Sequence, residues 1–154
     1  MIEERLLELG IDLPPAPAPV ASYVPVRIAD VMAFVAGQIP MEEGRLMLTG
    51  AVDAEITVEQ AQEGARRCAL QALAALREAL GSLDRVLSIA QLTVYVASSP
   101  GFTQQPAVAN GASDILVEIF GEEGRHARAA VGVAELPLGS PVEVVVTAVI
   151  ARTL

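Results

Sequence analysis

The segment from Gly124 to Thr153 reads GRHARAAVGVAELPLGSPVEVVVTAVIART, and its pattern of apolar and turn residues decides the fold. Two apolar runs, Ala127–Leu136 and Val142–Ala151, lie on either side of Pro137-Leu138-Gly139-Ser140. Short β-branched runs separated by proline and glycine are typical of two strands joined by a turn. The chain is therefore expected to end in a β-hairpin.

Each of these two runs contains a charged residue, Arg128 in the first and Glu143 in the second. A charge in such a strand is costly to bury unless it is paired or used. In a tight hairpin, Arg128 would lie opposite Val149 and Glu143 opposite Ala134, on one face but about 20 Å apart. A structural ion pair between them would need a bulge or a longer connection. Otherwise the two residues meet across a subunit boundary, in a pocket that draws on more than one chain.

The clearest helix begins after Thr57, because Thr57 and Gln60 have the spacing of a capping box. Small and apolar residues, Cys68 among them, recur at three- and four-residue intervals as far as Leu80, so we interpret Cys68 as a core residue. Gly81 has the place of a C-terminal stop. The other expected elements are a hairpin over Tyr23–Ala36, a turn at Glu43-Gly44, strands at Leu46–Leu48 and Val86–Ala97, and a helix at Pro106–Phe120. Gly111 weakens the prediction of this last helix, because glycine is a poor helix former. This order predicts an α+β fold, with one mixed sheet and two helices packed on one face.

Residues 1–154 are expected to form one domain, in which 1–22 are an N-terminal extension. Glu3–Leu9 is predicted to form a short amphipathic helix that ends at Gly10. The PPAPAP sequence of Pro14–Pro19 forbids helix and favours extended polyproline geometry. We interpret it as a rigid connector packed on the surface.

Composition excludes several classes of function. The formal net charge of −9 argues against a nucleic-acid partner. All ten basic residues are arginine, which excludes a lysine Schiff base and a P-loop. His126 and Cys68 are the only residues of their types, so no multi-histidine or multi-cysteine metal site is expected. No apolar stretch approaches the roughly 20 residues of a membrane helix, and the acidic start is unlike a signal peptide. We therefore expect a cytoplasmic protein without a membrane partner.

The chain resembles the RidA (YjgF) family of enamine/imine deaminases over nearly its whole length, in a longer branch with an N-terminal extension. The matching pieces are Tyr23-Val24, Ala36-Gly37-Gln38-Ile39-Pro40, Leu92–Val96, Ala127-Arg128, Glu135-Leu136-Pro137 and Val142-Glu143-Val144. The resemblance implies a chorismate-mutase-like fold and a homotrimer with pockets between subunits. It also implies hydrolysis of reactive 2-imino acids to 2-keto acids and ammonia without a cofactor.

The same resemblance implies the roles of individual residues. Arg128 would clamp the carboxylate of the substrate, and Glu143 would position the attacking water. The residues that would line the pocket are Tyr23, Ala36 at a position where many members have serine, Gly37 through its backbone, Asn110, and Ala130 at a position where many members have cysteine.

The residue types suit this chemistry, since an arginine fork matches a carboxylate and a glutamate can hold a water and move protons. His126 is interpreted as a surface or capping residue, with a proton donor at the pocket rim as the alternative role. The alternative function is a non-catalytic trimer that binds small carboxylates as a metabolic sensor, which Ala36 and Ala130 favour. A ribonuclease fits poorly with the acidity and the single histidine.

Overall fold

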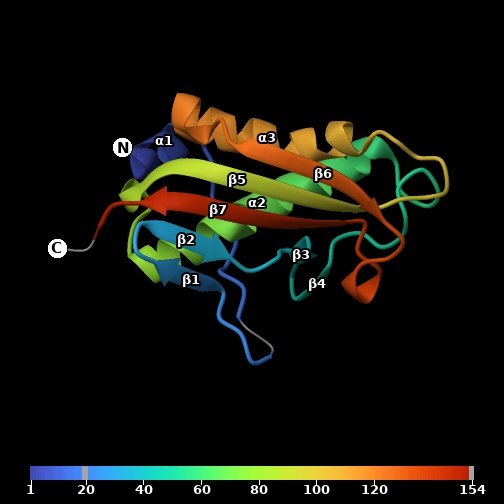
Figure 1. Ribbon diagram of the computed structural model, residues 1–154, viewed down its shortest axis with the longest axis horizontal. Helices are drawn as coiled ribbons and strands as arrows, with labels where there is room; N and C mark the ends of the chain where they lie inside the picture. The colour runs from blue at the N-terminus through green and yellow to red at the C-terminus, as the bar shows by residue number, and fades with distance from the viewer. Residues whose placement is uncertain (19–20, 153–154) are drawn as a thin grey trace.

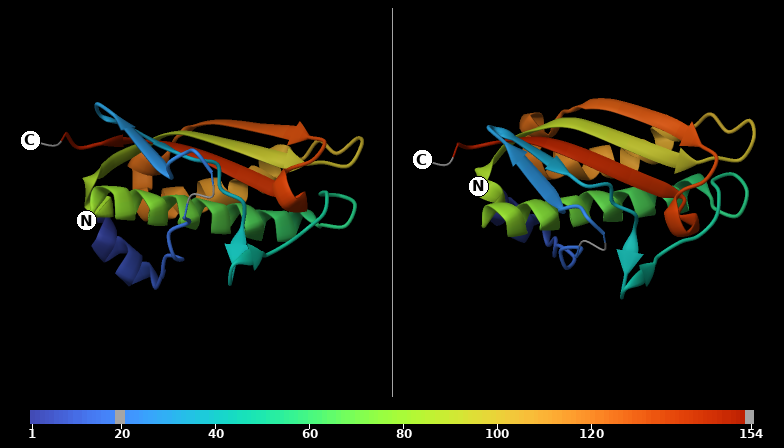
Figure 2. Two further views of the ribbon diagram at one scale, coloured as in Figure 1. Left: turned by 90° about the horizontal axis from the view of Figure 1, so that it is seen from below. Right: turned by 60° about the horizontal axis from the view of Figure 1, so that its bottom comes forward.

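The computed structural model describes residues 1–18 and 21–152, and it has one main layer of strands covered on one face by helices (Figures 1 and 2). The five-stranded sheet has the order β1-β2-β7-β5-β6, in which only β5 and β6 are parallel. Its strands are β1 (Val26–Ala29), β2 (Met32–Val35), β5 (Val86–Ala97), β6 (Ala127–Val133) and β7 (Val142–Ile150), and the helices are α1 (Ile2–Leu9), α2 (Val58–Leu80) and α3 (Gln105–Phe120). This confirms a mixed sheet with α2 and α3 on one face.

The predicted terminal hairpin is wrong, because β6 and β7 do not pair with each other. β5 lies between them, parallel to β6 and antiparallel to β7 (Figure 1). The Pro137–Gly139 segment forms a single 3₁₀ turn within a connection that passes over the end of β5. The two strands themselves are where the sequence predicted them, but each pairs with β5 and not with the other.

Helix α2 begins as the sequence predicted. The Thr57 hydroxyl accepts the backbone N–H of Gln60 at 3.1 Å, and the Gln60 side chain accepts the N–H of Thr57 at 2.9 Å. Gly81 ends the helix with φ +83°, in the left-handed region that glycine tolerates. Cys68 is fully buried, which confirms its place in the core.

Helices α2 and α3 cross at Gly111, which explains a glycine inside a helix. A Cβ at this position would collide with the backbone carbonyl of Gln62 in α2. The Gln62 side chain donates to the carbonyl of Ala107 at 2.8 Å and so fastens the crossing. The glycine that weakens α3 locally therefore allows the two helices to approach closely.

The short hairpins also match the sequence pattern. β1 and β2 pair around a turn at Asp30, and β3 (Met41–Glu42) pairs with β4 (Arg45–Leu46) around Glu43 and Gly44. Glu43 and Gly44 have φ values of 50° and 77°, as a tight hairpin turn requires. The strand expected at Leu46–Leu48 is shorter, and it belongs to this separate ribbon and not to the main sheet.

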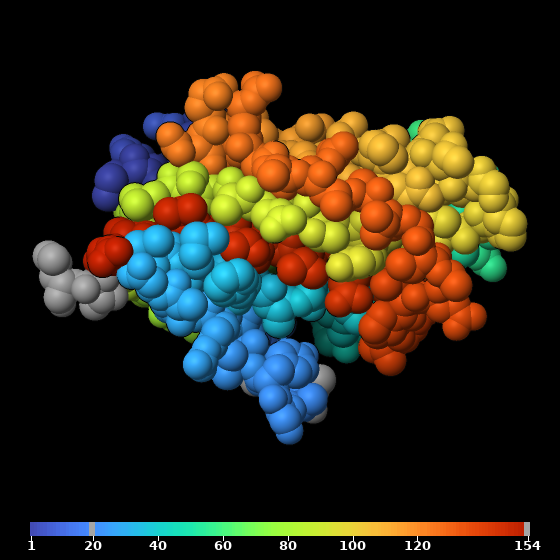
Figure 3. Space-filling model, viewed as in Figure 1, coloured from blue at the N-terminus to red at the C-terminus, as the bar shows by residue number. Residues whose placement is uncertain are grey.

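The N-terminal arm, residues 11–18 after α1, contains no helix or strand and runs behind the sheet, on the side of α2 (Figures 1 and 2). Figure 3 shows the opposite face of the molecule, on which the strands lie. Glu3 in α1 anchors the arm, since the Glu3 carboxylate pairs with Arg77 at 2.6 Å and accepts the N–H of Leu83. The predicted polyproline stretch contains no helix as far as Ala18, and Pro19 lies outside the described residues. None of the helices in the described ranges is long and apolar enough to cross a membrane.

Candidate functional site

Arg128 is held in place by α3. It pairs with the buried Leu92 on β5, so its side chain lies on the sheet face that the helices cover. Its Nη1 donates to the Asn110 Oδ1 at 2.8 Å and to the Ser113 Oγ at 3.1 Å. Asn110 and Ser113 are three residues apart and share one side of α3. Arg128 forms no ion pair with any residue in the described part of the chain, so its positioned charge is available to an anion.

His126 supports this arrangement from the other side of Ser113. The His126 Nδ1–H donates to the carbonyl of Gly124 at 2.7 Å, which leaves Nε2 to accept the Ser113 hydroxyl at 2.9 Å. Burial, followed by the nearby charge of Arg128, lowers the pKa of His126 and favours the neutral ring. His126 therefore caps the 3₁₀ turn that ends at Gly124, and it also orients the hydroxyl that contacts Arg128. The sequence analysis did not identify Ser113. The only feature that could have indicated it is its three-residue spacing from Asn110, which places both residues on one side of α3.

Glu143 lies on the opposite face of the sheet. It pairs with Tyr95 on β5, between the buried Val142 and Val144. Burial raises the pKa of this half-buried carboxyl group. A Cβ at Gly37 would collide with the Glu143 Oε1, so a side chain at this position would push the carboxylate aside. The 37–38 segment is fixed here by paired hydrogen bonds between Gln38 and Val144 at 2.8 and 2.9 Å.

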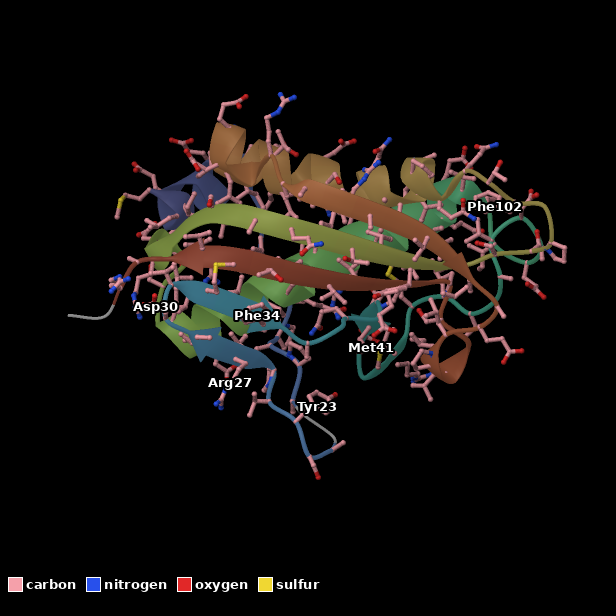
Figure 4. All side chains as sticks on the ribbon, in the orientation of Figure 1. Tyr23, Arg27, Asp30, Phe34, Met41 and Phe102 are labelled. Carbon is pink, nitrogen blue, oxygen red and sulfur yellow. The ribbon has the colours of Figure 1, made fainter. Side chains whose placement is uncertain are left out.

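Tyr23, Ala36 and Gly37, three further residues predicted for the site, line a cavity of about 470 Å³. The N-terminal arm and α2 form other walls of this cavity. Figure 4 shows Tyr23 and Met41 at the edge of the molecule from which the arm and the β3–β4 ribbon project. Tyr23 is half exposed, so its ring is available to a ligand.

Ala130 lies apart from that cavity. It pairs with Val94 on β5 and packs partly buried against the core. It is on the same strand and the same face as Arg128, two residues further along. Only a methyl group is therefore present where many family members were expected to have a thiol.

A single chain thus brings the predicted residues together in two separate groups. Arg128 and Asn110 form one, while Tyr23, Ala36, Gly37 and Glu143 form the other. Arg128 and Glu143 pair with Leu92 and Tyr95, which are three residues apart, so the two charges face opposite sides of the sheet. Their Cα atoms are about 14 Å apart at two strand spacings and three residues. The prediction that they share a face is therefore wrong.

No group of three or more potential metal-ligating side chains lies together in residues 1–18 and 21–152. What the two groups do offer is an oriented guanidinium for an organic anion and a half-buried carboxylate for a water or a proton. These suit recognition of a small carboxylate and acid–base chemistry beside it.

Known proteins resemble this chain over most of its length. A family model described as "YjgF/chorismate mutase-like, putative endoribonuclease" matches residues 3–150. Protein TCP17 of Trypanosoma cruzi is 49% identical over 144 residues, which are 93% of this chain and 90% of that protein. The structure of Atu1372 from Agrobacterium tumefaciens, of unknown function, is 43% identical with a TM-score of 0.87, covering 97% of this chain and 91% of that one. A Shewanella oneidensis protein that carries the same endoribonuclease description is 33% identical with a TM-score of 0.92, covering 97% and 99%.

These matches confirm the fold that the sequence resemblance implied, an α+β fold with a mixed sheet and helices. They extend over the same strands and helices that carry Arg128 and Glu143. The chain belongs to the YjgF/chorismate-mutase-like family.

Proposed function

We propose that the protein hydrolyses reactive 2-imino acids and enamines to 2-keto acids and ammonia, without a cofactor, in pockets between the subunits of a homotrimer. One observation carries this proposal. Arg128 is oriented by two hydrogen bonds, without a carboxylate partner in the described chain, while the half-buried Glu143 faces the other side of the sheet. Within one chain, Arg128 and Glu143 lie on opposite faces of the sheet and cannot contact the same ligand. This supports a site in which Arg128 of one chain meets Glu143 of another.

The chemistry follows from the two groups. Arg128 would bind the substrate carboxylate through two parallel charge-assisted hydrogen bonds and fix the C=N carbon in one place. The ionised Glu143 would hold a water molecule and take its proton as the oxygen bonds to that carbon. This proton passes to the nitrogen, which gives a carbinolamine. The proton of the new hydroxyl group then also moves to nitrogen through Glu143, the C–N bond breaks, and ammonia leaves as the keto group forms. General base catalysis of this kind contributes roughly 10²–10⁴-fold to a rate.

Association between copies is supported by the exposed surface of the sheet. β6 pairs only with β5 among the described strands, so its other edge has backbone groups free to pair. The sheet face away from the helices also carries Phe34 and Val131, which are 46% and 42% exposed. Burying such apolar groups against a second copy is favourable. A cytoplasmic location for this trimer stays a prediction.

The direct test generates 2-iminobutyrate in situ and follows its decay with the wild type, Arg128→Ala and Glu143→Gln. Both variants should lose the acceleration that the wild type gives. Arg152→Ala is a matched control, because this exposed arginine pairs with Asp30 at 3.2 Å and does not line the cavity that contains Arg128. A wild type that is no faster than buffer would rule out the deaminase.

A second candidate is a non-catalytic sensor that binds small carboxylates. Ala130 favours it, since the strand position beside Arg128 offers only a methyl group. In that case the wild type would bind butyrate or 2-oxobutyrate in calorimetry without accelerating imine decay. Arg128→Ala would abolish that binding, and Glu143→Gln would leave it nearly unchanged.

A further inference from the structure

The cavity beside Gly37 contains a positive charge that the proposed mechanism does not use. Arg67 of α2 lines this cavity, together with the apolar Pro14, Pro17 and Ile39. The Arg67 Nε donates to the carbonyl of Met41 at 2.8 Å. No other hydrogen bond and no ion pair of Arg67 is found in the described residues, so the donors of its two terminal nitrogens are uncommitted. A half-buried cation in this state is stabilised by an anionic ligand.

The two glutamines that line the cavity have their hydrogen bonds satisfied. Gln71 is only 3% exposed: its oxygen accepts the N–H of Met41 at 2.7 Å, and its nitrogen donates to Gln38 and Ile39. The Gln38 nitrogen in turn donates to the carbonyl of Ala36 at 3.0 Å. Arg67 is therefore the one cationic side chain that lines the cavity, and its free donors favour an anion over a neutral polar ligand.

An acidic side chain could neutralise Arg67 and remove this preference. Glu43, at the tip of the β3–β4 turn, is the acidic residue that lines the cavity. It is exposed and forms no ion pair with Arg67 in the described chain. The charge of Arg67 is thus not cancelled by the protein.

The cavity is also connected to the proposed reaction site. Gln71 and Arg67, four residues apart on one side of α2, fasten the backbone at 39–41 through the hydrogen bonds above. The same segment continues to Gly37, which lines the cavity and lies against the Glu143 carboxylate. Glu143 does not line the cavity itself, so a substrate held near Glu143 would reach Arg67 by passing Gly37, which borders both.

We propose that this cavity binds the far end of the substrate side chain, and that Arg67 selects a second carboxylate there. The preferred substrates would then be dicarboxylic 2-imino acids, with their methylene groups against the proline-rich wall. A volume of about 470 Å³ is ample for such a side chain. This inference rests on the proposed function for the chemistry, but the binding preference can be tested without it.

The kinetic experiment compares 2-iminoglutarate with 2-iminobutyrate, each generated in situ. Arg67→Gln should lower the ratio of kcat/KM for the diacid to kcat/KM for the monoacid by about 10- to 100-fold, the value of one charge-assisted contact. Arg67→Lys keeps the charge and should restore part of the preference. Arg66→Gln is the matched control, because it removes an identical charge one residue away, from a side chain that does not line this cavity.

A second variant and a binding measurement test the same cavity independently of Arg67→Gln kinetics. Ala16→Asp places a carboxylate in the cavity wall without removing a side-chain hydrogen bond, so it should reduce the diacid preference even where Arg67→Gln impairs folding. Calorimetry with glutarate and butyrate should show tighter binding of glutarate by the wild type and by Arg66→Gln, but not by Arg67→Gln.

The outcomes separate the two proposals. If the wild type hydrolyses neither imine but still prefers glutarate through Arg67, the deaminase proposal fails and the anion subsite stands. If the wild type hydrolyses the monoacid and shows no preference for the diacid, or if Arg67→Gln keeps that preference, the subsite is overturned and the deaminase stands.

Discussion

Arg128 is positioned by neighbours whose roles differ from its own. Asn110 and Ser113 restrict the rotamer of its long side chain, and His126 orients the Ser113 hydroxyl. A flexible arginine would lose side-chain entropy on binding a carboxylate, and these contacts reduce that loss before the ligand arrives. We therefore treat Asn110, Ser113 and His126 as positioning residues.

Removing the Ser113 hydroxyl should weaken substrate binding without abolishing chemistry. Ser113→Ala deletes one hydrogen bond to Arg128, worth about 1 kcal/mol, so KM should rise roughly fivefold while kcat changes little. Ser113→Thr retains a hydroxyl and should restore the KM. An unchanged KM in Ser113→Ala, measured by steady-state kinetics of imine decay, would contradict the positioning role.

Glu143 should give the activity an acid limb. Burial raises its pKa in the folded protein, and only the ionised form can act as a base, so the rate should fall as pH drops through this raised pKa. The rate of imine decay, corrected for the uncatalysed reaction at each pH, measures this limb. A limb centred well below the ordinary glutamate pKa would contradict the role of burial.

The same raised pKa has a consequence for stability. The stabilising contribution of the neutral carboxyl is fully present below the unfolded-state pKa and is lost as pH rises through the folded pKa. Glu143→Gln should therefore be at least as stable as the wild type at pH 7, and the difference should vanish in acid. Denaturant unfolding at several pH values measures this difference.

Among the secondary-structure elements, the crossing of α2 and α3 depends on the missing side chain at Gly111. Alanine is the better helix former by about 1 kcal/mol, so an isolated α3 would gain from Gly111→Ala. In the folded protein the added Cβ meets the carbonyl of Gln62, and the helices must separate. We expect a net destabilisation of about 1–3 kcal/mol, the usual cost of overpacking, measured by urea unfolding. Glu118→Ala, an exposed change in the same helix, should be nearly neutral.

The sequence located most elements because their signals are local. The capping box of Thr57 and Gln60, the left-handed turn at Glu43-Gly44 and the alternation along β5 each depend on neighbours within a few residues. The terminal hairpin failed for the opposite reason. Alternation states which face a strand buries, but not which strand lies beside it, and here β5 pairs with both β6 and β7.

As an assembly, the protein should complete its sites only between copies. When Arg128→Ala and Glu143→Gln chains are co-expressed, some pockets combine an intact Arg128 from one chain with an intact Glu143 from another. With random mixing in a closed ring, about one quarter of the pockets should be restored, although each variant alone is inactive. Light scattering should show a trimer for each sample. Absence of any recovery in verified mixed trimers would mean that the site lies within one chain.

The amino-acid sequence was sufficient to predict the approximate positions of the helices and of the strands of the main sheet, the buried face of α2, and an arginine and a glutamate suited to organic acids. Hydrophobic periodicity and capping encode these features within short windows of the chain. The tertiary structure alone decided the strand order, and with it the separation of Arg128 from Glu143 onto opposite faces. It also revealed the roles of Ser113, His126 and Arg67. Their contacts join residues that are distant in sequence, and no local pattern specifies such contacts.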